Sequence, residues 1–173
     1  EAIVLYEKAF TLKDDNPRYA KISSLANAAG AYHKLQEYDK AIELCRQALG
    51  IYPDYQLALR LITFSYLKVG RFEEAAESAQ HLYAGNYLKP RNMFVLGFCL
   101  MKIDKYEEAI GYLRKALRRQ PKDSKTLYLI GVAMSKLHKY QRAEWFLKRA
   151  AQLAPNDISI PFYLVENSFK AGD

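Results

Sequence analysis

Apolar residues recur every three or four positions along most of the chain, in segments separated by short polar or proline-containing breaks. Within one segment the spacing i, i+3, i+4, i+7 places apolar side chains on a single helical face, as for Leu127, Ile130, Gly131 and Met134. This pattern predicts consecutive amphipathic helices and no strands. No apolar run approaches the roughly 18 residues that a membrane helix needs.

The pattern repeats with a period of 34 residues. Small, aromatic and basic positions all keep this spacing: Ala41, Ala75, Ala109 and Ala143; Tyr38, Phe72, Tyr106 and Tyr140; Lys34, Lys68, Lys102, Lys136 and Lys170. Proline follows the second helix of three repeats, at Pro53, Pro121 and Pro155, while Tyr87 stands where the remaining proline would be. A fixed period of this length indicates stacked helical hairpins, each of which buries its apolar face only against its neighbours.

These residues resemble the tetratricopeptide repeat family along nearly the whole chain. The family pattern of a large apolar residue, a Leu-Gly pair and an aromatic is read at Leu25, Ala28-Ala29, Tyr32 and at Met93, Leu96-Gly97, Leu100. The second-helix pattern is read at Ala109, Leu113, Ala116, Pro121. The resemblance implies an all-α, right-handed α-solenoid of antiparallel helix hairpins, with the whole of 1–173 forming a single array.

Numbering each repeat from position 1 to position 34 gives full repeats at 22–55, 56–89, 90–123 and 124–157. Residues 1–13 are expected to be the second helix of a partial repeat, and 158–173 the first helix of a further one, which makes ten helices. Five extra residues are expected in the connection around Asp14–Arg18. The second repeat departs from the pattern at Leu82 and Tyr87, and Gly85-Asn86 predicts a left-handed helix cap.

In this family, positions 2, 5, 6, 9, 12 and 13 of the first helices commonly face a concave groove. The residues that we expect to bind a peptide there are Asn27, Arg60, Phe64, Lys68, Arg91, Phe94, Phe98, Lys102, Tyr128, Val132, Lys136 and Phe162. They form an aromatic series edged by lysines, which suits an extended or helical segment with apolar anchors. The alternative is that these rings only pack on one another.

The charge is unevenly distributed. Residues 1–86 carry 10 basic and 11 acidic side chains, whereas residues 87–173 carry 16 basic and 8 acidic ones, so the second half has a net charge of +8. An acidic protein partner fits this half. The basic stretch Arg114, Lys115, Arg118, Arg119, Lys122 and Lys125 leaves nucleic acid or an anionic surface as an alternative ligand.

Two specialised sites of the family are incomplete here. The clamp that grips the C-terminal carboxylate of heat-shock chaperones would need more than Asn27, Arg91 and Lys125, because Leu61 and Val95 occupy two of its polar positions. The asparagine ladder resembling that of O-linked N-acetylglucosamine transferases is missing for the same reason.

Nothing in the sequence indicates catalysis, a metal site or a cofactor. Phosphate-binding loops, zinc-ligand spacings and nucleophile elbows are missing, and Cys45 and Cys99 are expected to be buried free thiols, which fits a reducing compartment such as the cytoplasm. His33 and His138 are expected to be solvated edge histidines and Trp145 a packing residue. The pairs Glu73-Glu74 and Glu107-Glu108 are expected to favour helix starts.

We therefore expect a protein–protein interaction module, such as a scaffold, an adaptor or a chaperone-like carrier, and not an enzyme. The alternatives are a regulatory or substrate-recruiting segment of a larger enzyme such as a glycosyltransferase, and a nucleic-acid or anionic-surface binder. Self-association through open faces of the terminal helices, at Ile3, Val4 and Phe162, is a further expectation.

Overall fold

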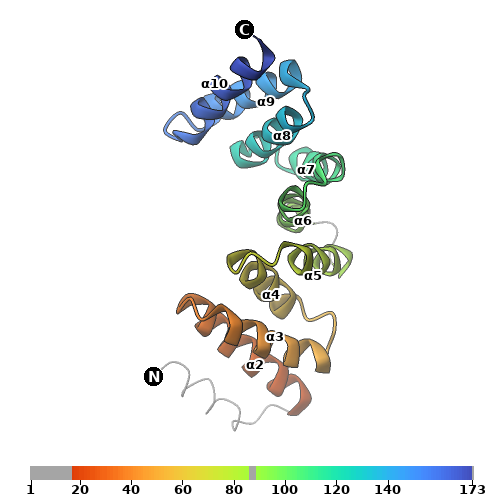
Figure 1. The fold of residues 1–173 in the computed structure, drawn as a ribbon. Helices are drawn as coiled ribbons and strands as arrows, with labels where there is room; N and C mark the ends of the chain where they lie inside the picture. Colours follow the sequence, from red (N-terminus) through yellow and green to blue (C-terminus); the bar gives the residue numbers. More distant parts are fainter. Residues whose placement is uncertain (1–16, 86–88, 173) are drawn as a thin grey trace. The chain divides into compact units, whose positions relative to one another are not determined.

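The computed structural model describes residues 17–85 and 89–172, and these residues form nine α-helices and no β-strand (Figure 1). The sequence-based predictions for the helix at 1–13, for Asn86 and for Tyr87 fall outside the described residues. Everywhere else the helices come in the order that the repeat predicts, which confirms the all-α hairpin fold.

The chain divides into two compact units, Glu1–Asn86 and Tyr87–Asp173, called here the N-terminal and the C-terminal unit. The N-terminal unit contains α2 (Pro17–Lys34), α3 (Tyr38–Ile51), α4 (Gln56–Lys68) and α5 (Phe72–Gly85). The C-terminal unit contains α6 (Pro90–Lys102), α7 (Tyr106–Arg119), α8 (Ser124–Lys136), α9 (Tyr140–Leu153) and α10 (Ser159–Ala171). Within each unit every helix packs against the next one, and α2 contacts α4 while α8 contacts α6 and α10.

The turn inside each hairpin is built in the same way in all four repeats. Position 15 has a positive φ: 63° at Gln36, 77° at Gly70, 59° at Asp104 and 57° at His138. The amide of position 16 donates to the carbonyl of position 11, as from Arg71 N to Tyr66 O at 2.9 Å. A left-handed residue with this six-to-one hydrogen bond is the Schellman helix ending. The turn therefore requires a backbone conformation that only glycine adopts without strain.

This turn gives a stability prediction. Gly70→Ala should destabilise the N-terminal unit by about 1 kcal/mol through backbone strain alone, because a Cβ at Gly70 would meet nothing within 4 Å. Gln36→Gly, at the same position of the preceding repeat, should instead stabilise it by about 0.5 kcal/mol. Urea unfolding followed by circular dichroism measures both changes. Two changes of the same sign would contradict the assigned turn.

Two glycines let the helices of a hairpin approach closely in the C-terminal unit. A Cβ at Gly97 would lie 2.7 Å from Leu113 Cγ, and one at Gly131 would lie 2.7 Å from Leu147 Cγ. In both pairs, the glycine is at position 8 in the first helix of a repeat and the leucine is at position 24 in the second helix of the same repeat. In the N-terminal unit the same two positions hold Ala29 with Cys45 and Thr63 with Ala79, all fully buried. A larger residue at position 8 thus accompanies a smaller one at position 24.

Two local expectations are wrong. Part of the extra sequence near Asp14–Arg18 is not a connection, because Pro17 and Arg18 begin α2, which starts five residues before Ile22. In this added turn, the Arg18 guanidinium donates to Ile51 O at the end of α3 (2.9 Å), which stabilises the helical extension. The left-handed cap at Gly85 is not formed, since Gly85 lacks a positive φ and is the last residue of α5.

Candidate functional site

The first helices of the two N-terminal repeats, α2 and α4, lie in direct contact and form one face of the N-terminal unit. A Cβ at Gly30 would lie 3.7 Å from Leu61 Cδ1, so two of the expected groove positions touch each other. Asn27 and Lys68 are exposed, whereas Arg60 and Phe64 are half-buried. The four predicted groove residues of this unit therefore form a surface that is both polar and apolar, in which Phe64 supplies the aromatic ring.

His33 belongs to this face and is not the solvated histidine that the sequence suggested. Its Nδ1 lies 2.9 Å from Ser65 Oγ, and its ring meets Tyr38 edge-on at 5.3 Å. Burial, and then the charge of Lys68, lower the pKa of His33 from its ordinary value. Both causes favour the neutral imidazole, so His33 acts here as a polar packing residue between α2 and α4.

The C-terminal unit gathers more aromatic side chains. Phe94, Phe98 and Tyr128 are half-buried and pack against a core that includes Leu129 and Ile130. The Lys102 ammonium lies 5.5 Å from the centre of the Phe98 ring, which is a cation–π distance. These side chains contribute to the core and still expose part of their rings.

A second group of rings joins α8 to α10. Tyr128 and Tyr163 meet edge-on with centroids 5.4 Å apart, and Tyr163 meets Phe162 in the same way at 6.0 Å. Burial raises the pKa of Tyr128 to about 12, so its hydroxyl stays protonated. Phe162 is 68% exposed and is the most accessible of the predicted aromatic anchors. Tyr163 stands at position 6, one of the positions that the family register assigns to the groove, beside Phe162 at position 5.

The remaining predicted groove residues differ in exposure. Arg91, Lys102 and Lys136 are exposed, whereas Val132 is only 7% exposed and offers little surface to a ligand. Asn27, Arg60, Phe64 and Lys68 lie in the N-terminal unit and the other eight in the C-terminal unit. Each unit is therefore considered as a binding surface of its own.

Trp145 is not the packing residue that the sequence suggested. It is 56% exposed, its ring meets Phe146 edge-on at 4.8 Å, and the Arg149 guanidinium lies 5.6 Å from it. Position 22 of the repeat points away from the paired helix, which explains the exposure. In contrast, Cys45 and Cys99 are buried free thiols as expected, and burial raises the pKa of each to about 12.

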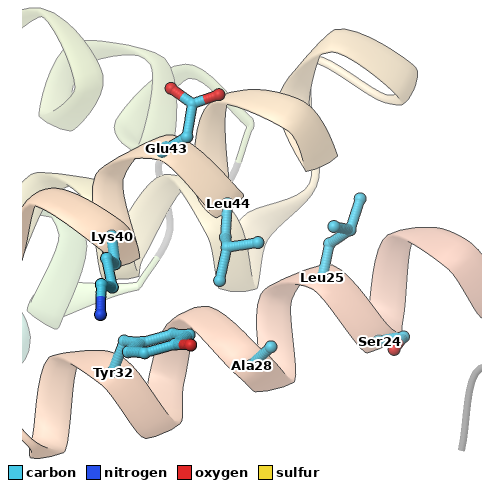
Figure 2. A pocket seen from close by; sticks show the side chains of 7 residues that line it. All are labelled: Ser24, Leu25, Ala28, Tyr32, Lys40, Glu43 and Leu44. Carbon is cyan, nitrogen blue, oxygen red and sulfur yellow. The ribbon is translucent and has the colours of Figure 1, made fainter. Parts of the chain in front are cut away.

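A pocket that the sequence did not reveal lies between α2 and α3 in the N-terminal unit (Figure 2). Its volume is about 450 Å³, and its wall is mostly apolar. The residues that line it are Ser24, Leu25, Ala28, Tyr32, Lys40, Glu43 and Leu44. Leu25, Ala28 and Tyr32 occupy positions 4, 7 and 11 of the repeat, which the hydrophobic pattern assigns to the core.

Across residues 17–85 and 89–172 there is no group of three or more His, Cys, Asp or Glu side chains that could hold a metal ion. Among these same residues no helix is both long and apolar enough to cross a bilayer. The described residues therefore offer apolar and basic contact surfaces.

Two family models match the sequence of the chain. The model described as tetratricopeptide repeat matches residues 22–55, and the model described as anaphase-promoting complex, cyclosome, subunit 3 matches residues 79–150. Residues 22–55 therefore form a tetratricopeptide repeat, and the chain is similar to proteins built from such repeats. The residues matched lie in both units, and the match at 22–55 coincides with the first full repeat that the hydrophobic pattern predicts.

Solved structures of tetratricopeptide repeat proteins share this fold. A crystal structure of MamA superimposes with a TM-score of 0.81 at 16% identity, covering 88% of this chain and 83% of that one. YrrB, described as a TPR protein with an unusual peptide-binding site, gives 0.78 at 17% identity over 98% and 88% of the two chains. MamA from Desulfovibrio magneticus RS-1 gives 0.74 at 15% identity over 91% and 98%. No curated protein sequence matches the chain.

Proposed function

We propose that the chain is a protein-interaction module that holds a peptide or helix of a partner protein against the first helices of its repeats. The observation that carries this proposal is the partly exposed aromatic series of the C-terminal unit, Phe94, Phe98, Tyr128 and Phe162. Partly exposed rings backed by a packed core are suitable anchors, because the rings are already ordered before a ligand arrives. A peptide-binding site in YrrB, a protein of the same fold, supports the proposal.

The chemistry of the partner follows from the charges near these rings. Lys102 lies over Phe98, and Arg91 and Lys136 are exposed on the same first helices. Residues 87–173 have a net charge of +8. We therefore expect a segment with apolar anchors and acidic neighbours, in which the charges mainly speed association and select the partner.

The test is a binding measurement with a library of acidic peptides that carry aromatic or aliphatic anchors, selected on the native chain. Phe162→Ala and Phe98→Ala should each weaken binding of a selected peptide about 30-fold, as expected for an anchor worth about 2 kcal/mol. Phe162 is the more informative site because its exposure makes the substitution harmless to the fold.

Trp145→Ala is the matched control, since Trp145 is an exposed aromatic of the same unit on a second helix. It should leave the affinity unchanged. A peptide that binds the native chain, Phe162→Ala and Phe98→Ala equally well would show that these rings serve the core only, and the proposed groove would be wrong.

A second candidate, binding of nucleic acid or another anionic surface, rests on a different observation. Arg114, Arg118 and Arg119 are exposed on α7, and Trp145 with Arg149 is exposed on α9. This function predicts affinity that falls by orders of magnitude as salt rises from 50 to 200 mM, as for a ligand held at about six or more phosphate contacts. Loss of binding in Trp145→Ala with no effect of Phe162→Ala would favour it. A role as the recruiting segment of a larger enzyme is compatible with the first proposal.

A further inference from the structure

Helix α10 has an apolar face that the other described helices leave open. Four side chains on this face are strongly exposed: Ile158 (88%), Phe162 (68%), Val165 (71%) and Phe169 (84%). These four residues are called here the α10 seam. The opposite side of the helix packs against α9 and α8, and there Ile160 and Asn167 are buried. The α10 seam exposes about 600 Å² of mostly apolar surface, and an apolar patch of this size usually marks an interaction site.

The α10 seam differs from the surface that a first helix offers to second helices in the other repeats. In each full repeat, positions 4 and 11 of the first helix are large: Leu25 and Tyr32, Leu59 and Tyr66, Met93 and Leu100, Leu127 and Met134. In α10 these positions hold Pro161 and Ser168. The large apolar residues of α10 stand instead at positions 1, 5, 8 and 12.

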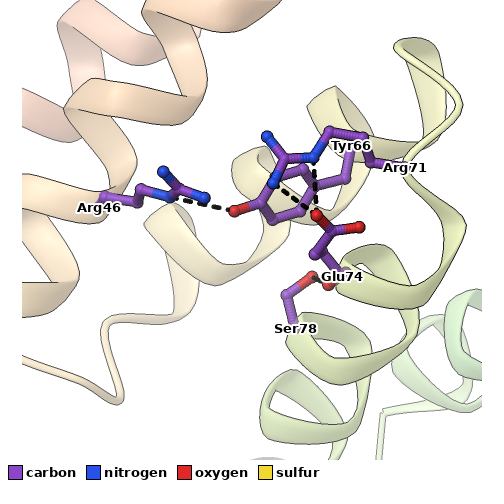
Figure 3. A network of polar contacts seen from close by, with 5 residues as sticks. All are labelled: Arg46, Tyr66, Arg71, Glu74 and Ser78. Atoms are coloured by element: carbon purple, nitrogen blue, oxygen red, sulfur yellow. Dashed lines mark hydrogen bonds and ion pairs between the residues drawn. The ribbon is translucent and has the colours of Figure 1, made fainter.

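Figure 3 shows what position 11 contributes in a first helix that is covered. Arg46 of α3 donates from Nε to Tyr66 Oη of α4 at 3.2 Å. The Arg71 guanidinium lies 4.8 Å from the Tyr66 ring and forms an ion pair with Glu74 of α5. One tyrosine therefore connects its helix to both neighbouring second helices. Ser168 is too short to make these contacts, so the open face of α10 is a surface of a different kind.

We propose that the α10 seam binds the α10 seam of a second copy of this chain, with the two helices antiparallel around a two-fold axis. The seam residues are spaced by four, three and four positions, which is the spacing of the apolar positions in a coiled coil. Ile158 has helical backbone angles and continues the seam past the first residue of α10. Because this spacing is the same in both directions, the seam is complementary to itself, as a two-fold contact requires.

The sizes of the seam residues favour the antiparallel direction. In this direction Phe162 lies opposite Val165 of the second copy, and Ile158 lies opposite Phe169. Each contact then joins a phenylalanine to a smaller β-branched residue. In a parallel pair each residue would meet its own equivalent, so that two phenylalanine rings would compete for one space at Phe162 and again at Phe169.

The charges at the ends of α10 favour the same direction. Lys170 and Asp157 are both exposed, and in the antiparallel pair Lys170 lies opposite Asp157 of the second copy. Glu166, which forms an ion pair with Lys170 in its own chain, lies opposite the uncharged Pro161. The dipoles of two antiparallel helices also attract each other. A parallel pair would instead bring Lys170 to Lys170 and Glu166 to Glu166.

The area of the contact determines its expected strength. Two copies that meet at the α10 seam bury about 1,000 Å² in total, which is at the small end of specific interfaces. We therefore expect a reversible dimer with a dissociation constant in the micromolar range. The inference does not rest on the proposed peptide groove, although Phe162 takes part in both.

Sedimentation equilibrium of the full chain, over about a 100-fold range of protein concentration, tests the proposal. We expect a monomer–dimer equilibrium. Val165→Glu and Phe169→Glu should each raise the dissociation constant by about 10-fold or more, because each dimer would then bury two carboxylates. Both side chains are exposed within the chain, so circular dichroism should show an unchanged helix content.

Two variants serve as controls. Trp145→Glu changes an exposed aromatic residue of the same unit on α9, and it should leave the dimer unchanged. Phe98→Ala should weaken peptide binding and also leave the dimer unchanged, so failure of the groove and failure of this contact give different results. A chain that stays monomeric throughout, or a dimer that Val165→Glu and Trp145→Glu affect equally, would show that the α10 seam does not bind a second copy.

Disulfide cross-linking gives a separate readout of the direction. Ile158→Cys and Phe169→Cys are made in two chains of different mass, and oxidation should join them when they are mixed but should join neither variant to itself. Cys45 and Cys99 are buried and do not compete. A disulfide that forms within either variant alone, and not in preference between the two, would mean that the helices are not antiparallel in this register, and the proposal would be wrong.

Discussion

Gly131→Thr should lower the free energy of unfolding of the C-terminal unit by about 3 kcal/mol, the upper end of the usual cost of overpacking a core. A Cβ at Gly131 would lie 2.7 Å from Leu147 Cγ and 3.2 Å from the carbonyl oxygen of Ala143. Leu147 is fully buried and cannot swing into solvent, so α8 and α9 must separate. Urea unfolding followed by the fluorescence of Trp145, the single tryptophan, reports on this unit.

Gly111→Ala is the control in the same unit. Gly111 is helical and exposed, and a Cβ there would meet nothing within 4 Å. The substitution should stabilise α7 by up to about 1 kcal/mol through helix propensity alone. If Gly131→Thr were as well tolerated as Gly111→Ala, the close approach of α8 and α9 would not limit stability.

The order and length of the helices could be predicted from the sequence because the repeat supplies four copies of the same evidence. Ala109 and Ala143, for example, keep the same spacing and are both fully buried. Features that occur in one repeat alone could not be predicted in this way, because no other repeat shows the same residues at the same positions. The added first turn of α2 depends on the contact of Arg18 with Ile51 O, which no periodic pattern encodes.

One regular feature was also missed. The left-handed turn at position 15 is held by Gln36, Gly70, Asp104 and His138, which have no side-chain chemistry in common. The hydrogen bond from position 16 to position 11 imposes the conformation on all four. Residue identity therefore says little about this turn, and only the spacing of 34 could have revealed it.

The candidate groove could be predicted less completely than the fold. A 3.6-residue periodicity identifies the face of a helix that avoids water, but it does not distinguish burial in the core from exposure in a groove. Val132 is in the core and Phe162 is exposed, although both were assigned to one surface. Trp145 shows the opposite error, since a large apolar residue was assumed to be buried.

The pocket between α2 and α3 shows why neighbours decide the outcome. Leu25 and Leu59 share position 4 of their repeats, yet Leu59 is 3% exposed beneath α3 while Leu25 lines an open pocket. The two side chains have the same chemistry, so residue type alone does not fix the exposure of this position. In a stack of hairpins, a face is a core or a docking surface according to what packs on it.

Leu147→Ala should destabilise the C-terminal unit by about 3 kcal/mol, because it leaves a cavity at a position that is fully buried. Combining it with Gly131→Thr should restore most of this loss, so that the double variant is more stable than either single one. The second repeat already contains this combination, since Thr63 and Ala79 occupy the same two positions there and are both fully buried. There the Thr63 hydroxyl donates to Leu59 O at 2.7 Å, so the threonine is satisfied within its own helix.

The same unfolding measurement checks this coupling, with Leu147→Ala combined with Gly97→Thr as the control. Gly97 faces Leu113 in the preceding hairpin, so its effect should add to that of Leu147→Ala. Additive losses in both combinations would mean that the two positions do not share one space. Compensation only in the Gly131 pair would show that the side chains at positions 8 and 24 of one hairpin share a fixed volume. The repeats could then differ in sequence at these two positions and keep the same distance between their two helices.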